Sequence, residues 1–150
     1  RAQMIGLEPD HTEEHLIRAV YEGVALAMKD CYEHIPDTPE EVFGAGGGAK
    51  SDFWTQMFAD AIDAEFAIPT GEEFGAKGAA LLAGTAVGVF EDFETAVQET
   101  RTLEKTYQPD PVDSPKYDEL YEYYKQTYET MFDIWEKRIE TIDAIEQLEE

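Results

Sequence analysis

Basic residues are scarce in this 150-residue chain, which has 7 lysines and 4 arginines against 34 aspartates and glutamates, a net charge of −23. So acidic a surface repels nucleic acid and anionic membranes, and we expect neither as a partner. The acids occur in every segment of the chain. This is typical of proteins that live in concentrated salt, where a Debye length of about 3 Å at 1 M screens self-repulsion. We therefore favour a halophilic protein over an ordinary acidic one.

Cysteine and long apolar runs are also rare. The single cysteine, Cys31, excludes a disulfide within the chain and a cysteine-based metal cluster. Because Cys31 falls on the apolar stripe of a predicted helix, we expect it to be buried. The longest apolar run, Gly78 to Phe90, is too short and too rich in glycine to span a membrane, and no signal peptide is recognisable. We expect a cytoplasmic protein that is a piece of a longer one, since the sequence begins at Arg1.

The apolar and aromatic content is sufficient for one folded α/β domain over residues 1–150. Apolar spacings of three and four predict a helix from Thr12 to Glu33, with Thr12 as N-cap and His15 in place of the usual capping-box acid. Two short strands, Glu41–Gly44 and Ala64–Ile68, flank a helix over Asp52–Ile62. Two strands joined by one crossover helix predict a right-handed parallel βαβ unit.

The second half of the chain is predicted to be helical. A helix from Thr70 or Gly71 to Gly88 contains so many glycines and alanines that we expect it to pack closely against the first helix. A short helix over Glu91–Thr100 and a proline-rich connection over Tyr107–Pro115 follow. A long C-terminal helix begins with Ser114 as N-cap, and its aromatic stripe predicts a core or helix seam. Its end, with Ile142, Ile145 and Leu148, could pair with another chain.

The turn Gly44–Ser51, between the first strand and the Asp52–Ile62 helix, is the feature most indicative of function. Glycines allow close approach of the backbone to a ligand, and the first N–H groups of a helix attract anions. A Walker loop fits at Gly44 and Lys50-Ser51 but has Ala49 where it needs glycine. The dinucleotide fingerprint fits at Gly44, Gly46 and Ala49 but lacks an acid after the second strand. A tight turn without a ligand is the third possibility.

Three segments together resemble the C-terminal domain of the FGGY carbohydrate kinases, the relatives of xylulokinase, ribulokinase and glycerol kinase. One is the glycine turn with the helix that follows it, and the other two are helical segments on either side of it in the sequence. In order along the chain they are Arg18–Ala25; Gly46–Ser51 with Trp54, Gln56, Ala59 and Asp60; and Glu73–Ala80. The combination covers about Gly6 to Trp135, and the Glu73–Ala80 segment looks closest to ketopentose and polyol kinases. Lys77 and Asp52 depart from the residues common at their positions.

The resemblance implies the C-terminal part of an actin-like, ribonuclease H-like ATPase domain: helix-rich, with a short parallel βαβ unit and a long C-terminal helix. It implies that ATP binds with Mg²⁺ and that its adenine side lies against Gly47, Gly48 and Ala49, with Lys50 and Ser51 at the entrance. The other implied nucleotide-binding residues are Gly46 in the turn and Asp52 directly after it. It also implies that the catalytic aspartate and the sugar pocket precede this chain, which would be inactive alone. Since such a fragment would expose a sheet edge and apolar surface, we expect a homo-oligomer.

Two alternatives to a kinase fragment stay open. One is a non-catalytic nucleotide-binding module on the same actin-like scaffold. The other is a helical interaction domain that binds no nucleotide. Outside the glycine turn, the polar stripe Gln56, Asp60 and Asp63 is expected to be a solvated face of its helix.

Overall fold

The computed structural model describes residues 3–37 and 39–147. The elements, in chain order, are α1 (Glu13–Glu33), β1 (Glu41–Phe43), the 3-10 turn η1 (Gly48–Lys50), α2 (Asp52–Ile62), β2 (Glu65–Pro69), α3 (Phe74–Ala86), α4 (Phe93–Thr100), β3 (Leu103–Tyr107), α5 (Ser114–Thr130) and α6 (Phe132–Glu146). The predicted start of α1 is confirmed, because Thr12 is the N-cap and its N–H donates to His15 Nδ1 at 3.0 Å.

The predicted βαβ unit is confirmed. Strands β1 and β2 are parallel, with Val42 opposite Phe66, and α2 is the crossover between them. A third strand, β3, pairs antiparallel with β2 on its other side, so the strand order is β1-β2-β3. Strand β3 was not predicted. Four of its five residues are exposed, so it lacks the apolar pattern that identifies a strand in a sequence.

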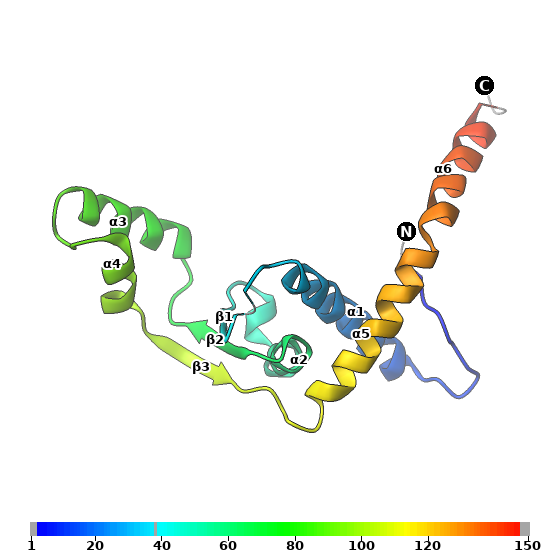
Figure 1. Ribbon diagram of the computed structural model, residues 1–150, viewed down its shortest axis with the longest axis horizontal. Helices are drawn as coiled ribbons and strands as arrows, with labels where there is room; N and C mark the ends of the chain where they lie inside the picture. The colour runs from blue at the N-terminus through cyan, green and yellow to red at the C-terminus, as the bar shows by residue number, and fades with distance from the viewer. Residues whose placement is uncertain (1–2, 38, 148–150) are drawn as a thin grey trace.

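The hydrophobic core lies where α1, α2 and α5 meet the first two strands, and Figure 1 shows these helices gathered beside the sheet. Helix α2 is its centre, as the apolar circumference of Asp52–Ile62 predicts. The aromatic stripe of α5 begins in this core, with Tyr117 and Tyr121 almost fully buried. The core residues are Ala25, Leu26, Val42, Met57, Phe58, Ala59, Ala61, Ile62, Ala64, Phe66, Tyr117 and Tyr121.

The predicted packing of the glycine-rich helix against the first helix is wrong. Helix α3 lies with α4 beyond one end of the sheet, remote from α1 (Figure 1). A Cβ added at Gly75 or Gly78 would meet nothing within 4 Å. The physical reason is topological: α3 follows β2 directly, and the strand carries the chain away from the core before the helix begins.

The buried face of α1 also differs from the prediction. Its buried positions are Ala25, Leu26 and Lys29, whereas Cys31 is exposed. Sequence spacing fixes the period of a stripe but not which way the helix is turned, and here contacts with α2 and α5 determine the orientation.

The C-terminal helix is broken at Met131 into α5 and α6, and α6 projects away from the rest of the molecule (Figure 1). Asp113, not Ser114, precedes the first turn of α5. The Ser114 hydroxyl instead donates to Asp60 O at 2.9 Å and to Asp63 Oδ1 at 2.7 Å. Ile142 and Ile145 belong to α6, while Leu148 lies outside the described residues. Among the residues with described structure, no helix is both long and apolar enough to cross a membrane.

Candidate functional site

A cavity of about 640 Å³ opens at the glycine turn, between the end of β1 and the start of α2. The end of β2, the segment before α3 and the middle of β3 complete its walls. The lining residues are Gly44, Ala45, Gly46, Gly47, Ala49, Lys50, Asp52, Ile68, Pro69, Gly71, Glu72, Phe74, Glu104 and Lys105. The site is therefore placed at the end of the βαβ unit, as expected for ligands of α/β folds.

The glycines of the turn have distinct roles. Gly44 continues the sheet, with its N–H donating to Ala67 O at 2.9 Å, and a Cβ there would overlap the Phe66 ring. Gly46 has a φ of +90°, which side chains rarely adopt. Gly47 has a right-handed helical conformation, and a Cβ on it would point into open space. At Gly46 and Gly47 the wall of the cavity is therefore bare backbone.

The seven residues predicted to bind nucleotide fall into two groups. Five of them line the cavity: Gly46, Gly47, Ala49, Lys50 and Asp52. The other two support the turn. Gly48 faces the Trp54 ring, whose nearest atom would be 3.2 Å from an added Cβ, and Ser51 accepts the Trp54 N–H at 3.3 Å as the N-cap of α2.

A buried threonine fixes the shape of the turn from behind. Thr55 is fully buried on α2, and its hydroxyl donates to Ser51 O at 2.9 Å. The same hydroxyl reaches Ala49 O at 3.5 Å. The chain around Ala49 and Ser51 is thus held to the first turn of α2, so the bare wall is part of a fixed scaffold.

Ion pairs occupy the rim of the cavity. Lys50 Nζ lies 3.3 Å from Glu72 Oε1, and Lys105 Nζ donates to Asp52 Oδ1 at 2.7 Å. The Tyr107 hydroxyl donates to the same Asp52 oxygen, also at 2.7 Å. These two hydrogen bonds, from Lys105 first and Tyr107 second, lower the pKa of Asp52, while the bond to Asp52 raises the pKa of Lys105.

Sequence reasoning missed Lys105, Tyr107 and Glu72. Lys105 and Tyr107 belong to β3, which was not recognised, and only pairing of β3 with β2 brings them to the start of α2. Glu72 precedes α3 and reaches Lys50 across the cavity rim. None of these three residues belongs to a local motif that would have identified it.

The predicted solvated face of α2 is wrong at its central residue. Asp60 is only 5% exposed, and its Oδ1 accepts hydrogen bonds from Gln56 Nε2 and the Asp110 N–H, both at 2.8 Å. Together with Ser114, Asp60 ties the connection between β3 and α5 to α2. The polar stripe of α2 thus supplies hydrogen-bond partners to the connection between β3 and α5 and is not simply a face covered by water.

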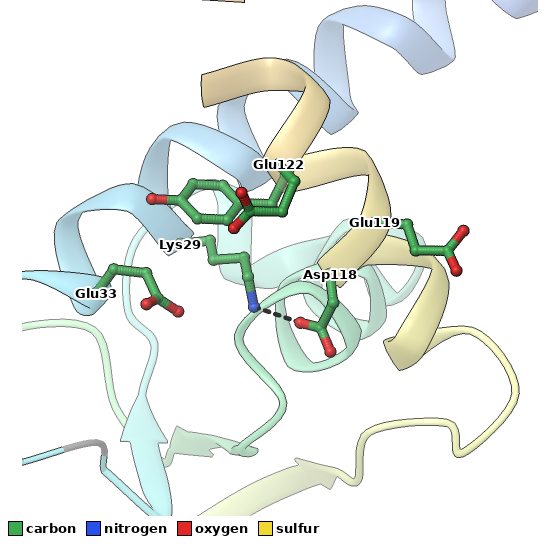
Figure 2. Close-up of a pocket in the computed structure, with 6 residues that line it drawn as sticks. Lys29, Glu33, Asp118, Glu119 and Glu122 are labelled. Carbon is green, nitrogen blue, oxygen red and sulfur yellow. Dashed lines mark hydrogen bonds and ion pairs between the residues drawn. The ribbon is translucent and has the colours of Figure 1, made fainter. Parts of the chain in front are cut away.

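A second cavity, of about 330 Å³, lies between α1 and α5 and is drawn in Figure 2. Lys29 lies at its centre, with Glu33, Asp118, Glu119 and Glu122 around it. Its ammonium is already engaged, with Asp118 Oδ1 at 2.8 Å and Ala61 O at 2.9 Å. We interpret this as a structural junction of three helices, since the one cation there has its partners within the chain.

The two expected cofactors differ in how well the residues fit them. The bare wall at Gly46 and Gly47 fits a flat ring that needs close approach to the backbone. Within residues 3–37 and 39–147, no group of three or more His, Cys, Asp or Glu could hold a metal ion. A Mg²⁺ ion would therefore depend mainly on ligands from elsewhere, such as phosphate oxygens and water.

Comparison with known proteins shows the family to which this chain belongs. The model of the FGGY family of carbohydrate kinases, C-terminal domain, matches residues 1–87. Erythritol kinase of Brucella abortus is 30% identical over 139 residues, which is 91% of this chain and 27% of that protein. Xylulose kinase of Bacillus subtilis is 30% identical over 131 residues, 85% of this chain and 26% of that one.

The fold agrees with these matches. Ligand-bound xylulose kinase from Lactobacillus acidophilus superimposes with a TM-score of 0.78 at 27% identity, covering 85% of this chain and 26% of that structure. The chain belongs to the FGGY family of carbohydrate kinases. The predicted fold, part of an actin-like ATPase domain with α/β structure, is confirmed. The chain spans about a quarter of the length of the curated relatives it matches.

Proposed function

We propose that this chain is the C-terminal nucleotide-binding part of an ATP-dependent carbohydrate kinase that acts in the cytoplasm. The substrate class we propose is a pentulose or a polyol, phosphorylated on a hydroxyl group. Its support is that relatives are named for xylulose and erythritol. In this proposal the sugar and the catalytic residues are supplied by a preceding domain, and Mg²⁺ arrives with the phosphates of ATP.

The observation that carries the proposal is the bare backbone wall at Gly46 and Gly47, facing a cavity of about 640 Å³. We place the nucleotide base against this wall, with Ala49, Lys50 and Asp52 along the rim. Gly48 and Ser51 contribute by shaping the turn. A planar ring gains contact area where no side chain intervenes, and glycine provides that at this position.

The test uses Gly47→Val, titrated with Mg-ATP by calorimetry in molar KCl. Gly47 has a helical φ and open space at its Cβ, so the variant should fold normally. We expect its affinity for Mg-ATP to fall at least about tenfold, because two methyl groups would fill the space beside the wall. Gly78→Val on α3 is the matched control, since its Cβ also meets nothing and it lines no part of this cavity. Equal affinities for both variants would contradict the proposed site, and no binding by the unaltered chain would favour a helical interaction domain.

We further propose that the chain is inactive by itself. Phosphoryl transfer needs a positioned nucleophile and stabilised charge on the transferred group, and in this proposal both come from the preceding domain. The measurement is ADP release from the purified 150-residue chain with Mg-ATP and either xylulose or erythritol. Sugar-dependent ADP release above the buffer rate would overturn this part of the proposal.

We also propose that the isolated chain forms a homo-oligomer. Large apolar side chains are exposed on α1, at Ile17, Val20 and Val24, and on α6, at Phe132 and Ile134. Surfaces of this kind tend to be covered by another surface. Light scattering in 2 M KCl should give a mass of at least twice 16.9 kDa. A monomer across the micromolar range would contradict it.

A further inference from the structure

Asp52 poses an electrostatic problem for the proposed site. It is the first residue of α2 and lines the cavity, at the end of a helix where backbone N–H groups attract anions. A carboxylate at this position competes with an anionic ligand for the same N–H groups, and it also repels the ligand directly. The problem is general in this cavity, because its lining has three acids, Asp52, Glu72 and Glu104, against two lysines.

The structure contains an arrangement that answers this problem. Lys105 and Tyr107, two residues apart on β3, both donate to Asp52 Oδ1 at 2.7 Å. An ammonium and a phenol therefore converge on one oxygen of one carboxylate. Lys105 cancels the charge of Asp52, and the pair of bonds draws its side chain toward β3. Asp52 and Lys105 are 69% and 51% exposed, so the pair lies at the open rim where a ligand would enter.

We propose that Lys105 is a positioning residue of the nucleotide site: by pairing with Asp52, it lets a polyphosphate anion approach the start of α2. This rests on the proposed nucleotide function. Lys105 acts through Asp52, and Tyr107 directs the carboxylate by its second hydrogen bond. The ligand class is a nucleoside polyphosphate, for which an uncompensated carboxylate at the rim would be a barrier.

The competing interpretation is that the Lys105–Asp52 pair only ties β3 to α2. An exposed ion pair contributes little to stability. A purely structural role therefore predicts that breaking the pair has a small effect on folding, and that ligand affinity does not depend on the charges of Lys105 and Asp52. The two interpretations differ in what happens when both charges are removed together. If the Asp52 charge repels the ligand, removing the charges of both Lys105 and Asp52 should restore binding. If the pair only ties β3 to α2, removing both leaves the tie broken and restores nothing.

The experiment is a titration of the full 150-residue chain with Mg-ATP in 0.15 M and 1 M KCl, using Lys105→Met, Asp52→Asn and the double variant. We expect Lys105→Met to weaken binding about five- to tenfold at 0.15 M KCl, from one unit of uncompensated charge near several phosphate charges. We expect the double variant to return to within about twofold of the unaltered chain. The defect of Lys105→Met should shrink at 1 M KCl, where the Debye length is about 3 Å.

Lys116→Met is the matched control. It removes one positive charge from an exposed ion pair, with Asp113 at 2.6 Å, and Lys116 lines no part of this cavity. Its affinity should stay near that of the unaltered chain. Asp52→Asn alone should bind Mg-ATP at least as tightly as the unaltered chain. This variant tests the inference independently if Lys105→Met folds poorly.

Three outcomes would overturn the inference. They are an unchanged affinity in Lys105→Met, a double variant as weak as Lys105→Met, and a loss of affinity in Asp52→Asn, which would make Asp52 itself a ligand. Each leaves the nucleotide site in place, because the unaltered chain would still bind Mg-ATP. Failure of the unaltered chain to bind Mg-ATP at millimolar concentration overturns the proposed function as well.

Discussion

Lys29 Nζ donates to Asp118 Oδ1 at 2.8 Å across the junction of α1 and α5. Lys29 is only 6% exposed, although its partner's side chain is 61% exposed. The same ammonium donates to Ala61 O at the end of α2 and lies 5.7 Å from the centre of the Tyr121 ring. One buried cation thus connects the three helices of the core, and Figure 2 shows its bond to Asp118.

Replacing Lys29 with methionine should destabilise the chain by about 1–3 kcal/mol, because the Ala61 carbonyl loses its buried donor. Asp118→Asn should cost less, about 1 kcal/mol, because Asp118 is largely solvated and an amide oxygen can still accept. Urea unfolding followed by circular dichroism measures both. The free energy of unfolding should also depend on salt concentration differently in the two variants, with Asp118→Asn showing the weaker dependence. Equal destabilisation in the two would contradict a role centred on the Ala61 contact.

The buried carboxylate of Asp60 gives a second prediction. Asp60→Ala should lose about 2–3 kcal/mol of stability, since the Asp110 N–H and the Gln56 amide lose their shared acceptor. Asp60→Asn keeps an acceptor oxygen in place and should cost about half as much. Thermal unfolding in 2 M KCl checks the order. If the two variants were equally stable, the hydrogen bonds would not be what holds the β3–α5 connection.

The fate of Asp60 illustrates what the sequence could and could not predict. Local signals were sufficient for the βαβ unit, the glycine turn and the cap at Thr12, because each depends on residues close in sequence. They failed where partners come from afar: Asp60 is buried by residues 50 positions on, and β3 takes its place only through pairing with β2.

The same reasoning applies to the candidate site. Five of the seven predicted residues line the cavity because they belong to one continuous segment, the glycine turn and the first residue of α2. Lys105 and Glu72 join them only through the tertiary fold, so no local pattern could identify them. Helix α3 shows the converse: its glycines indicated a close packing partner, but a Cβ added at Gly75 or Gly78 would meet nothing within 4 Å, and Gly84 faces the Phe90 ring and not α1.

Tyr121 gives a prediction about alkaline pH. Its hydroxyl donates to Asp30 Oδ1 at 2.8 Å, and burial, followed by this hydrogen bond, raises the pKa of Tyr121 well above its ordinary value of about 10. A raised pKa means that the stabilisation is complete below about pH 10 and is lost as pH rises through the folded-state pKa.

Tyr121→Phe should therefore be less stable than the unaltered chain by about 1–2 kcal/mol at pH 8, with the gap narrowing above pH 10. Urea unfolding at pH 8, 9, 10 and 11 measures it. Tyr123→Phe is a suitable control, because Tyr123 is 57% exposed and its replacement should change the free energy of unfolding little. If the difference in free energy of unfolding between Tyr121→Phe and the unaltered chain widened above pH 10, it would contradict a raised pKa of Tyr121.

The net charge of −23 gives the last prediction, on salt. Repulsion among 34 acidic side chains destabilises the compact state, and at 0.15 M salt the Debye length of about 8 Å leaves much of it unscreened. We expect the midpoint of thermal unfolding to rise by at least about 10 °C between 0.15 M and 2 M KCl. Choline chloride at equal ionic strength should reproduce most of the gain if screening is the cause. No gain up to 2 M KCl would exclude adaptation to salt, and a gain specific to K⁺ would point to bound cations instead of screening.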